Sequence, residues 1–298
     1  MEKTNPKNKI QVTTGERIFN VFNILFMLFI AFIMFYPIWH VLMASVSESN
    51  LLMTHRGLLF WPEGFSWAAY RYVARNPAIP QGYMVTLFVV IVGTTVNIIM
   101  TSLAAFFVTR KNQFLAKYVM MMIMFTMFFG GGMIPEYLNV RDLGLYNSLW
   151  ALIIPASINT FNCIILRTSF LGLPESLEES ARLDGASEFT ILFRIYIPLS
   201  KAVLAVLVLY YGVAHWNSWF SAMLYIQDRS KFPLQLLLRE ILISNDTSSM
   251  ANTSADFTLI AETIKYALIV VVSFPILCLY PFLQKYFTKG VLVGAVKG

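Results

Sequence analysis

The segment Pro174–Glu188, with the sequence PESLEESARLDGASE, carries five acidic residues and one arginine between two strongly hydrophobic runs. Its leading proline suits the first turn of a helix, and the glutamates that follow place negative charge near the positive helix N-terminus. Asp184-Gly185 interrupts this helix, because glycine tolerates the left-handed conformation at a helix end and aspartate can cap the next helix. A second helix over 187–196 is expected to end before Pro198. Two short helices joined at a glycine turn are typical of a docking surface and not of an active site.

The composition of the flanking chain identifies its solvent. Of the 298 residues, 57% are hydrophobic and 13% are charged, whereas about 25% are charged in a typical soluble domain. A membrane helix needs about 20 mostly apolar residues to cross about 30 Å of hydrocarbon. We therefore expect an all-α membrane protein with six transmembrane helices, near residues 18–44, 83–108, 118–134, 148–170, 200–225 and 264–287. The third run is short and ends in three glycines, so its outer end is expected to be broken or held against neighbours.

The distribution of basic residues predicts the orientation, because Lys and Arg are retained on the cytoplasmic side. With the N-terminus inside, 14 of the 22 lysines and arginines lie in cytoplasmic segments, and the other eight share the longer outer loops with nine of the 16 acids. Both termini are therefore predicted to be cytoplasmic. The chain then divides into an N-terminal segment (1–17), a six-helix membrane domain (18–287) with a cytoplasmic loop (172–199), and a C-terminal tail (288–298).

The first run has a recognisable start. Thr13 and Glu16 have the spacing of a capping box and predict a helix N-terminus just before it. The run is too long for a signal peptide, so we expect it to remain as the first spanning helix. Cys163 and Cys278 lie inside apolar runs without metal-ligand spacing, and we expect them to be packing residues.

Several kinds of chemistry are missing from the sequence. No GxxxxGK[ST] loop is present to hold the phosphates of ATP, and the spans are nearly free of the ionisable groups that an ion-coupled carrier needs. No histidine has a metal-ligand partner at helical spacing, no paired carboxylates lie within a span, and no basic patch with interleaved aromatics suggests nucleic acid. We therefore expect a pathway driven by a separate protein bound to the cytoplasmic face. A self-contained secondary transporter and a membrane enzyme are the alternatives.

Apolar residues within the loop 172–199 indicate how it packs. The first helix is expected to carry one apolar stripe, formed by Leu177, Ala181 and Leu183. The second helix is expected to bury three side chains, those of Phe189, Leu192 and Phe193. An amphipathic loop lying on the lipid head groups is the alternative, but three clustered glutamates argue against it because an anionic surface repels them.

Three motifs in this loop resemble a known family. Glu179-Ser180-Ala181, Asp184-Gly185-Ala186 and Ile195-Tyr196-Ile197-Pro198-Leu199 are similar to the EAA loop of permease subunits of ATP-binding-cassette importers, with Ser180 where the family usually has alanine. In that family the loop forms coupling helices that sit in a cleft of a cytoplasmic ATPase. The resemblance implies that one glutamate pairs with the ATPase and that the glycine permits close approach. The implied coupling residues are Glu178, Glu179, Ala181, Asp184, Gly185 and Ala186, with these two roles falling on Glu179 and Gly185.

Four further stretches resemble carbohydrate-type (MalG-like) permeases. They lie at 143–155, 216–220, 232–235 and 294–298, so the resemblance covers about 80–298 and implies the type I importer permease fold. The long outer loop and the glycine-rich segment 130–135 are similar to permeases for larger oligosaccharides in Gram-positive bacteria. The family's tail reaches between two ATPase subunits, which implies contacts for Lys297 and Gly298. A frayed basic end is the alternative for the tail.

Aromatic and polar residues in the fifth run suggest a lining for the solute path. Aromatic faces can stack on the C–H surfaces of sugars, while asparagine and histidine can bond hydroxyl groups. The competing interpretation is an interfacial aromatic belt, which is expected of any spanning helix. The candidates are Tyr211, His215, Trp216, Asn217 and Trp219, with Tyr210 and Tyr225 beside them.

Together these features predict a non-catalytic permease subunit in a bacterial cell membrane. Its expected partners are a second, similar permease, two ATP-binding-cassette ATPase subunits, an external solute-binding protein and membrane lipid, with no nucleic acid. We expect no cofactor on this chain, with ATP and Mg²⁺ on the partner ATPase subunits. The expected cargo is a sugar, and an oligosaccharide in particular.

Overall fold

The computed structural model describes residues 13–110, 113–244 and 262–278, and these residues form helices and loops with no strand other than one isolated bridge between Ser47 and Phe65. The chain divides into two compact units. The first comprises residues 1–70 and 255–270, and the second comprises 71–254 and 271–298. The division falls within α3 (Ala68–Arg75).

The first unit contains α1 (Thr14–Ser45) and α2 (Ser49–Thr54). The expected capping box starts α1: the Thr13 N–H donates to Glu16 Oε2 at 2.7 Å, and the Glu16 N–H donates to Thr13 Oγ1 at 3.4 Å. Within α1 the buried residues are Ala44 and Ser45. The remaining apolar surface of α1 is therefore available to lipid or to another subunit.

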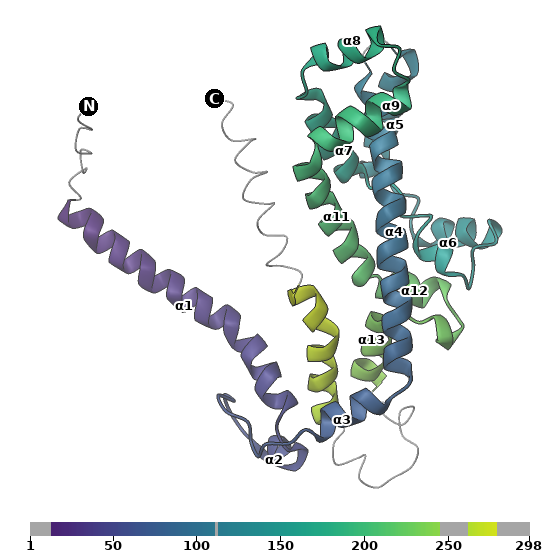
Figure 1. Ribbon diagram of the computed structural model, residues 1–298. Coiled ribbons are helices and arrows are strands. Elements are labelled where there is room, and N and C mark those ends of the chain that lie inside the picture. Colours follow the sequence, from purple (N-terminus) through teal and green to yellow (C-terminus); the bar gives the residue numbers. More distant parts are fainter. Residues whose placement is uncertain (1–12, 111–112, 245–261, 279–298) are drawn as a thin grey trace. The chain divides into compact units, whose positions relative to one another are not determined.

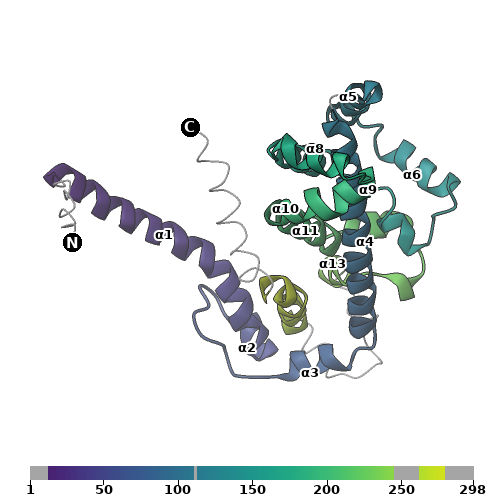
Figure 2. The same ribbon diagram turned by 45° about the horizontal axis from the view of Figure 1, so that its top comes forward.

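In the second unit α4 (Ala78–Thr109) is the helix against which the others pack. Figures 1 and 2 both show α11 running beside it. The remaining elements, in chain order, are α5 (Phe114–Phe128), α6 (Met133–Asp142), a 3-10 turn (Leu149–Leu152), α7 (Thr160–Leu171), α8 (Glu175–Leu183), α9 (Glu188–Ile191), a π-helical turn (Leu192–Tyr196), α10 (Ile197–Leu199), α11 (Lys201–Trp216), α12 (Trp219–Tyr225), a 3-10 turn (Arg229–Lys231) and α13 (Leu234–Ser244).

Two hydrophobic clusters lie toward opposite ends of α4. One surrounds Phe106 with residues of α7, the π-helical turn and α11, and the other surrounds Val89 with residues of the first 3-10 turn, α12 and α13. Four buried residues with polar groups lie on α4 and α11 and form what we call the polar layer: Asn97, Thr101, Tyr211, which also borders the cluster around Phe106, and His215. Asn97 Oδ1 lies 2.6 Å from His215 Nε2, and Tyr211 Oη lies 2.7 Å from Thr101 Oγ1.

The polar layer also fixes a break in the predicted fourth span. The Asn97 amide donates to the Ala156 carbonyl at 2.5 Å, and the Asn159 N–H donates to Tyr211 Oη at 3.1 Å. The prediction of one helix over 148–170 is wrong, because the 3-10 turn stops at Leu152 and α7 starts at Thr160. Pro155 lies in the gap, where it lacks the N–H that an unbroken helix requires.

The predicted fifth span is broken as well. α11 ends at Trp216 and α12 begins at Trp219, so the prediction of one helix over 200–225 is wrong. Asn217 caps α11 by donating its side-chain amide to the Val213 carbonyl at 3.0 Å. Side-chain bonding to the last carbonyls of a helix competes with its continuation. The expected break near the three glycines is present, because α5 ends at Phe128 and Gly132 has a φ of 88°.

The number of spans is therefore a question of how broken segments are counted. Within the described residues, α1 and α4 are each long and apolar enough to cross a membrane, and a third span results if the bent pair Glu188–Leu199 and Lys201–Trp216 is counted as one. α5, with 15 residues, extends only about 22 Å at 1.5 Å per residue. Residues 264–278 of the sixth run are helical, and its last nine residues lie outside the described part of the chain. A count of six is not confirmed.

Segments predicted to lie on opposite sides of the membrane meet opposite ends of α4. Figure 1 shows α8 and α9 at one end of α4, and α12 and α13 toward the other. Arg110 and the loop 172–199, both predicted to be cytoplasmic, meet at the first of these ends. Gln81, near the opposite end of α4, bonds the Ser230 carbonyl of the predicted outer loop at 2.9 Å.

Candidate coupling site

The loop 172–199 forms two helical arms joined at Gly185. At the end of α8, the Ala186 N–H donates to the Ala181 carbonyl at 2.9 Å and the Gly185 N–H donates to the Arg182 carbonyl at 3.0 Å. These two bonds define a Schellman turn, which needs a left-handed residue. Gly185 provides it with a φ of 77°. The predicted glycine turn is confirmed, and both alanines have a role in closing it.

The second arm differs from its prediction in two respects. Ser187, and not Asp184, is the N-cap of α9, since Ser187 Oγ accepts from the Thr190 N–H at 3.3 Å. The arm also continues through Pro198 as far as Leu199, before meeting α11 at an angle of 87°. The helix passes the proline by way of a π-helical turn, in which the Ile197 N–H donates to the Leu192 carbonyl. Single π turns of this kind are frequent at functional sites.

The faces of α8 are divided differently from the predicted stripe. Ala181 is partly buried against the cluster around Phe106, but Leu183 is 90% exposed. These two residues are about 200° apart around a helix at 100° per residue, so they cannot share one face. The prediction that Phe189 and Phe193 are buried is also wrong, since they are 66% and 49% exposed, whereas Leu192 is buried.

An exposed face of α8 therefore combines one acid and one large apolar side chain. Glu179 and Leu183 are four residues apart and lie on the same side of the helix. Glu179 is exposed, and no hydrogen bond or ion pair joins its carboxylate to another described residue. An alanine methyl added at Gly185 would meet no atom within 4 Å, so the space beside the turn is open. This combination of Glu179, Leu183 and Gly185 is the docking face.

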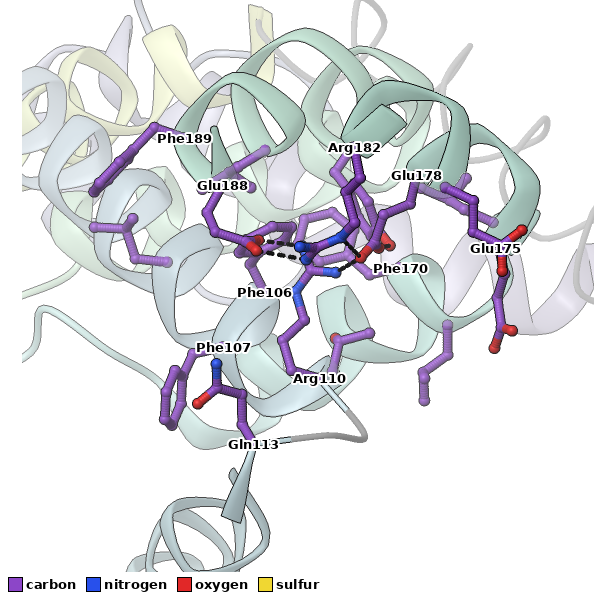
Figure 3. Close-up of a pocket in the computed structure, with 17 residues that line it drawn as sticks. Phe106, Phe107, Arg110, Gln113, Phe170, Glu175, Glu178, Arg182, Glu188 and Phe189 are labelled. Carbon is purple, nitrogen blue, oxygen red and sulfur yellow. Dashed lines mark hydrogen bonds and ion pairs between the residues drawn. The ribbon is translucent and has the colours of Figure 1, made fainter. Parts of the chain in front are cut away.

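Glu178 lies about 100° further around the helix and is held by its own chain. Its carboxylate pairs with Arg110, accepts from Arg182 Nε at 3.0 Å and accepts from the Tyr196 hydroxyl at 2.6 Å. Arg110 Nη2 also donates to Glu188 Oε2 at 2.8 Å. Figure 3 shows Arg110 and Arg182 between the two glutamates, one on each arm. These five residues, Arg110, Glu178, Arg182, Glu188 and Tyr196, form what we call the charged clamp.

The guanidinium of Arg110 is largely enclosed. Its Cζ lies 4.0 Å from the centroid of the Phe106 ring, and the side chains of Arg110 and Glu178 are 13% and 18% exposed. An arginine on an aromatic face is attracted by the ring electrons, and its planar fork suits a carboxylate. The clamp therefore connects the last turn of α4 to both arms of the loop.

Two ionisable groups of the clamp are shifted. Burial raises the pKa of the Glu178 carboxyl, but hydrogen bonds from Tyr196, Arg182 and Arg110 outweigh it, so the pKa lies below its ordinary value. For Tyr196, burial and the hydrogen bond to Glu178 raise the pKa to about 12. Glu178 is therefore anionic and Tyr196 neutral at physiological pH.

A hollow of about 810 Å³ lies between the end of α4 and the two arms. Phe106, Gln113, Glu179 and Phe189 are among the residues that line it, and Figure 3 shows the clamp running across it. The clamp was not predicted from the sequence, in which Arg110 was only one of the 14 basic residues counted as cytoplasmic. The four-residue spacing of Glu178 and Arg182 was its one local signal.

The candidates for the solute path are divided by the structure into two groups. Tyr211, His215 and Trp216 are buried within this chain, where the first two belong to the polar layer. Asn217 is exposed at the break between α11 and α12, and Trp219 is partly buried there. Tyr225 is buried, Tyr210 is exposed, and the tail residues Lys297 and Gly298 lie outside the described part of the chain. No group of three or more His, Cys, Asp and Glu side chains in the described residues could hold a metal ion.

A helical membrane chain with a two-armed docking face beyond one end of its central helix has the features of a transport subunit. The family model described as "Binding-protein-dependent transport system inner membrane component" matches residues 113–293. The chain belongs to this family, and it is a permease subunit of an ATP-binding-cassette importer for sugars.

Individual relatives agree with this assignment. The polygalacturonan/rhamnogalacturonan transport system permease protein YtcP of Bacillus subtilis is 42% identical, over 88% of this chain and 92% of that protein. Protein LplC of the same organism is 40% identical, over 96% and 97%. A chain in the crystal structure of a bacterial ABC transporter involved in the import of the acidic polysaccharide alginate matches with a TM-score of 0.85 and 31% identity, covering 92% of this chain and 98% of the other.

Proposed function

We propose that this chain imports oligosaccharides that carry carboxylate groups, as one of two permease subunits that together enclose the path. Two similar proteins support an acidic cargo, since one is named for polygalacturonan and rhamnogalacturonan and the other belongs to an alginate importer. The remaining partners are two ATPase subunits, which bind ATP and Mg²⁺, and an external solute-binding protein. Neither catalysis nor ATP binding is assigned to this chain.

The observation that carries the proposal is the different engagement of two adjacent glutamates. Glu178 is engaged by the charged clamp, whereas Glu179 is exposed beside Leu183 and the open glycine turn. In this proposal Glu179 pairs with a cation on the ATPase, Leu183 enters an apolar part of its cleft, and Gly185 permits close approach. Movement of α8 then passes through Glu178 and Arg110 to α4.

The topology in the proposal follows the charge distribution. Six spans place both termini in the cytoplasm of a bacterium, with a Gram-positive host suggested by the Bacillus relatives. Lys297 and Gly298 then contact the ATPase subunits. The broken fourth segment counts as a span because its gap is bonded by Asn97 and Tyr211 of the polar layer. The fifth counts as a span because only Asn217 and Ser218 separate α11 from α12.

The decisive experiment uses the full-length chain with an affinity tag, purified from native membranes in mild detergent. A second permease and an ATPase are expected to co-purify and to be identified by mass spectrometry. After reconstitution, ATP and a loaded solute-binding protein should drive uptake of tri-galacturonate. Ion-driven uptake by the chain alone, without ATP, would instead establish a self-contained secondary transporter.

A further inference from the structure

The break between α11 and α12 lies beside the N-terminal half of α4. His215, one turn before the break, packs so closely on Gly93 that an added Cβ there would lie 2.6 Å from its Nε2. α13 packs near Gly82 and Thr86, because the Leu234 N–H donates to Thr86 Oγ1 at 2.8 Å. Residues 82–93 lie roughly 6 to 22 Å from the Ala78 end of α4 at 1.5 Å per residue. The break is therefore within the predicted outer half of the membrane.

Broken helices at this depth are where transporters bind their cargo, because unwound backbone and polar side chains are tolerated only where they line protein or water. Four side chains meet at the break. Gln235 Nε2 donates to Asn217 Oδ1 at 3.3 Å, and the guanidinium carbon of Arg239 lies 4.6 Å from the ring centroid of Trp219. Gln235 and Arg239 are one turn apart on α13, so they present to the same side.

Arg239 differs from the other cations in this part of the chain. Arg229 pairs with Glu240 at 3.5 Å, and Lys231 pairs with Asp228 at 3.7 Å. Arg239 forms no ion pair with any carboxylate of the described residues; instead its charge rests on the indole of Trp219. Stacking holds the planar guanidinium in one orientation while leaving its N–H groups available for a carboxylate.

We propose that Asn217, Trp219, Gln235 and Arg239 form a subsite for one uronate residue of the oligosaccharide during its passage. Arg239 binds the carboxylate, the indole of Trp219 packs on the sugar ring, and the two amides bond its hydroxyl groups. This proposal rests on the acidic cargo proposed above. It adds the residues that select the acid, two of which, Gln235 and Arg239, lie outside the fifth run.

An aromatic belt that anchors the chain at the lipid head groups is the competing explanation for Trp219 and Arg239. The two explanations differ in the expected effect of removing the positive charge of Arg239. A belt tolerates loss of a single cation, whereas a carboxylate site loses its main partner. They also differ in whether the sugar touches residues 217–239.

The test uses the complete importer in proteoliposomes, with its solute-binding protein saturated by tri-galacturonate. Arg239→Gln is expected to lower uptake by about tenfold or more, because the carboxylate of the sugar then loses its charged partner. Arg239→Lys keeps a positive charge and is expected to restore part of the uptake. The matched control is Arg229→Gln, which removes an exposed cation from the same end and should change uptake by less than about twofold.

A second measurement does not depend on variants. Tri-galacturonate carrying a diazirine is photolysed with the wild-type importer during turnover, and crosslinked peptides are mapped by mass spectrometry. Crosslinks within 217–239 are expected. Uptake unchanged by Arg239→Gln, or crosslinks confined to other segments, would overturn the subsite while leaving the acidic cargo intact. Failure of the wild-type importer to take up tri-galacturonate would overturn the proposed cargo itself.

Discussion

Arg110 and Glu178, 68 positions apart in the sequence, form an ion pair that connects the end of α4 to the middle of α8. Their charges are joined by those of Arg182 and Glu188, so neither arm can move without disturbing α4. An ion pair with little exposure resists solvent screening better than one at the surface. The pair is thus a mechanical link between the docking face and the helix that lines the polar layer.

Arg110→Gln is expected to weaken this link. It removes the charged partner of Glu178 and Glu188, and we expect a loss of about 1–3 kcal/mol in the free energy of unfolding, since Arg182 and Tyr196 still satisfy Glu178. Uptake per ATP hydrolysed should fall in the reconstituted importer, measured alongside thermal unfolding of the purified complex. A double-mutant cycle with Glu178→Gln should give a coupling energy of about 0.5–3 kcal/mol.

The control for this prediction is Arg141→Gln. Arg141 pairs with Asp142 at 3.0 Å, but both side chains are more than half exposed. Its removal should change stability by less than about 0.5 kcal/mol and leave uptake per ATP unchanged. Equal effects of the two substitutions would show that the clamp has no special role.

Two substitutions of Gly185 test two different properties of the glycine turn, its backbone conformation and the open space beside it. Gly185→Ala strains a backbone with a φ of 77° and should cost about 1–2 kcal/mol, although the added methyl has free space. Gly185→Trp adds bulk to the docking face and should abolish ATP hydrolysis stimulated by the loaded solute-binding protein without preventing membrane insertion.

The comparison for backbone strain alone is Gly144→Ala, since Gly144 has a φ of 70° and equally open surroundings. Gly144→Ala should lower the free energy of unfolding by the same amount as Gly185→Ala but leave stimulated ATP hydrolysis intact. If Gly185→Trp retains normal stimulated hydrolysis, the turn does not approach the ATPase closely.

Sequence reasoning found the features that are local and missed those that depend on tertiary contact. The glycine turn and the capping box at Thr13 follow from the preferences of a few adjacent residues. The clamp does not, because Arg110 reaches Glu178 only after α4, α7 and α8 have packed. Phe189 and Phe193 were predicted to be buried because hydrophobicity indicates burial without naming the partner, and both are exposed in this chain.

The breaks in the fourth and fifth spans were missed for a related reason. Hydropathy averages over about 20 residues, and Pro155 and Asn217 are single interruptions within apolar runs. The break near Pro155 persists because Asn97 and Tyr211 bond the freed backbone, which no window of adjacent residues reveals. The break at Asn217 follows from the bond of its side-chain amide to the Val213 carbonyl.

The pH dependence of the clamp follows from its two shifted groups. Glu178 has a pKa below its ordinary value of 4.5, so its contribution to stability is complete above that value and is lost as the pH falls through the lower folded pKa. Tyr196 has a pKa raised from 10.0 to about 12, so its contribution is complete below 10 and is lost as the pH rises toward 12.

Thermal unfolding of the purified complex across this range should resolve both effects. Glu178→Gln should remove part of the acid dependence, and Tyr196→Phe part of the alkaline dependence. Tyr118→Phe is the control, because Tyr118 is exposed on α5 and lies outside the clamp. Unaltered pH profiles in both clamp variants would contradict the assignment of these groups.

The last prediction concerns the close contact of α4 with α11. At Gly93 an added Cβ would lie 2.6 Å from His215 Nε2, the atom that bonds Asn97. We expect Gly93→Ala to displace the imidazole, separate it from Asn97 and cost about 1–3 kcal/mol, since overpacking and the loss of a buried hydrogen bond both act. Gly212→Ala on α11 is the matched control, because its Cβ would lie 3.8 Å from Thr94 Oγ1, an ordinary contact. There the gain in helix propensity should dominate and stabilise the chain by about 0.5–1 kcal/mol. Thermal unfolding of the two variants should therefore shift in opposite directions, and a shift in the same direction would mean that α4 and α11 are not packed as closely as Gly93 allows.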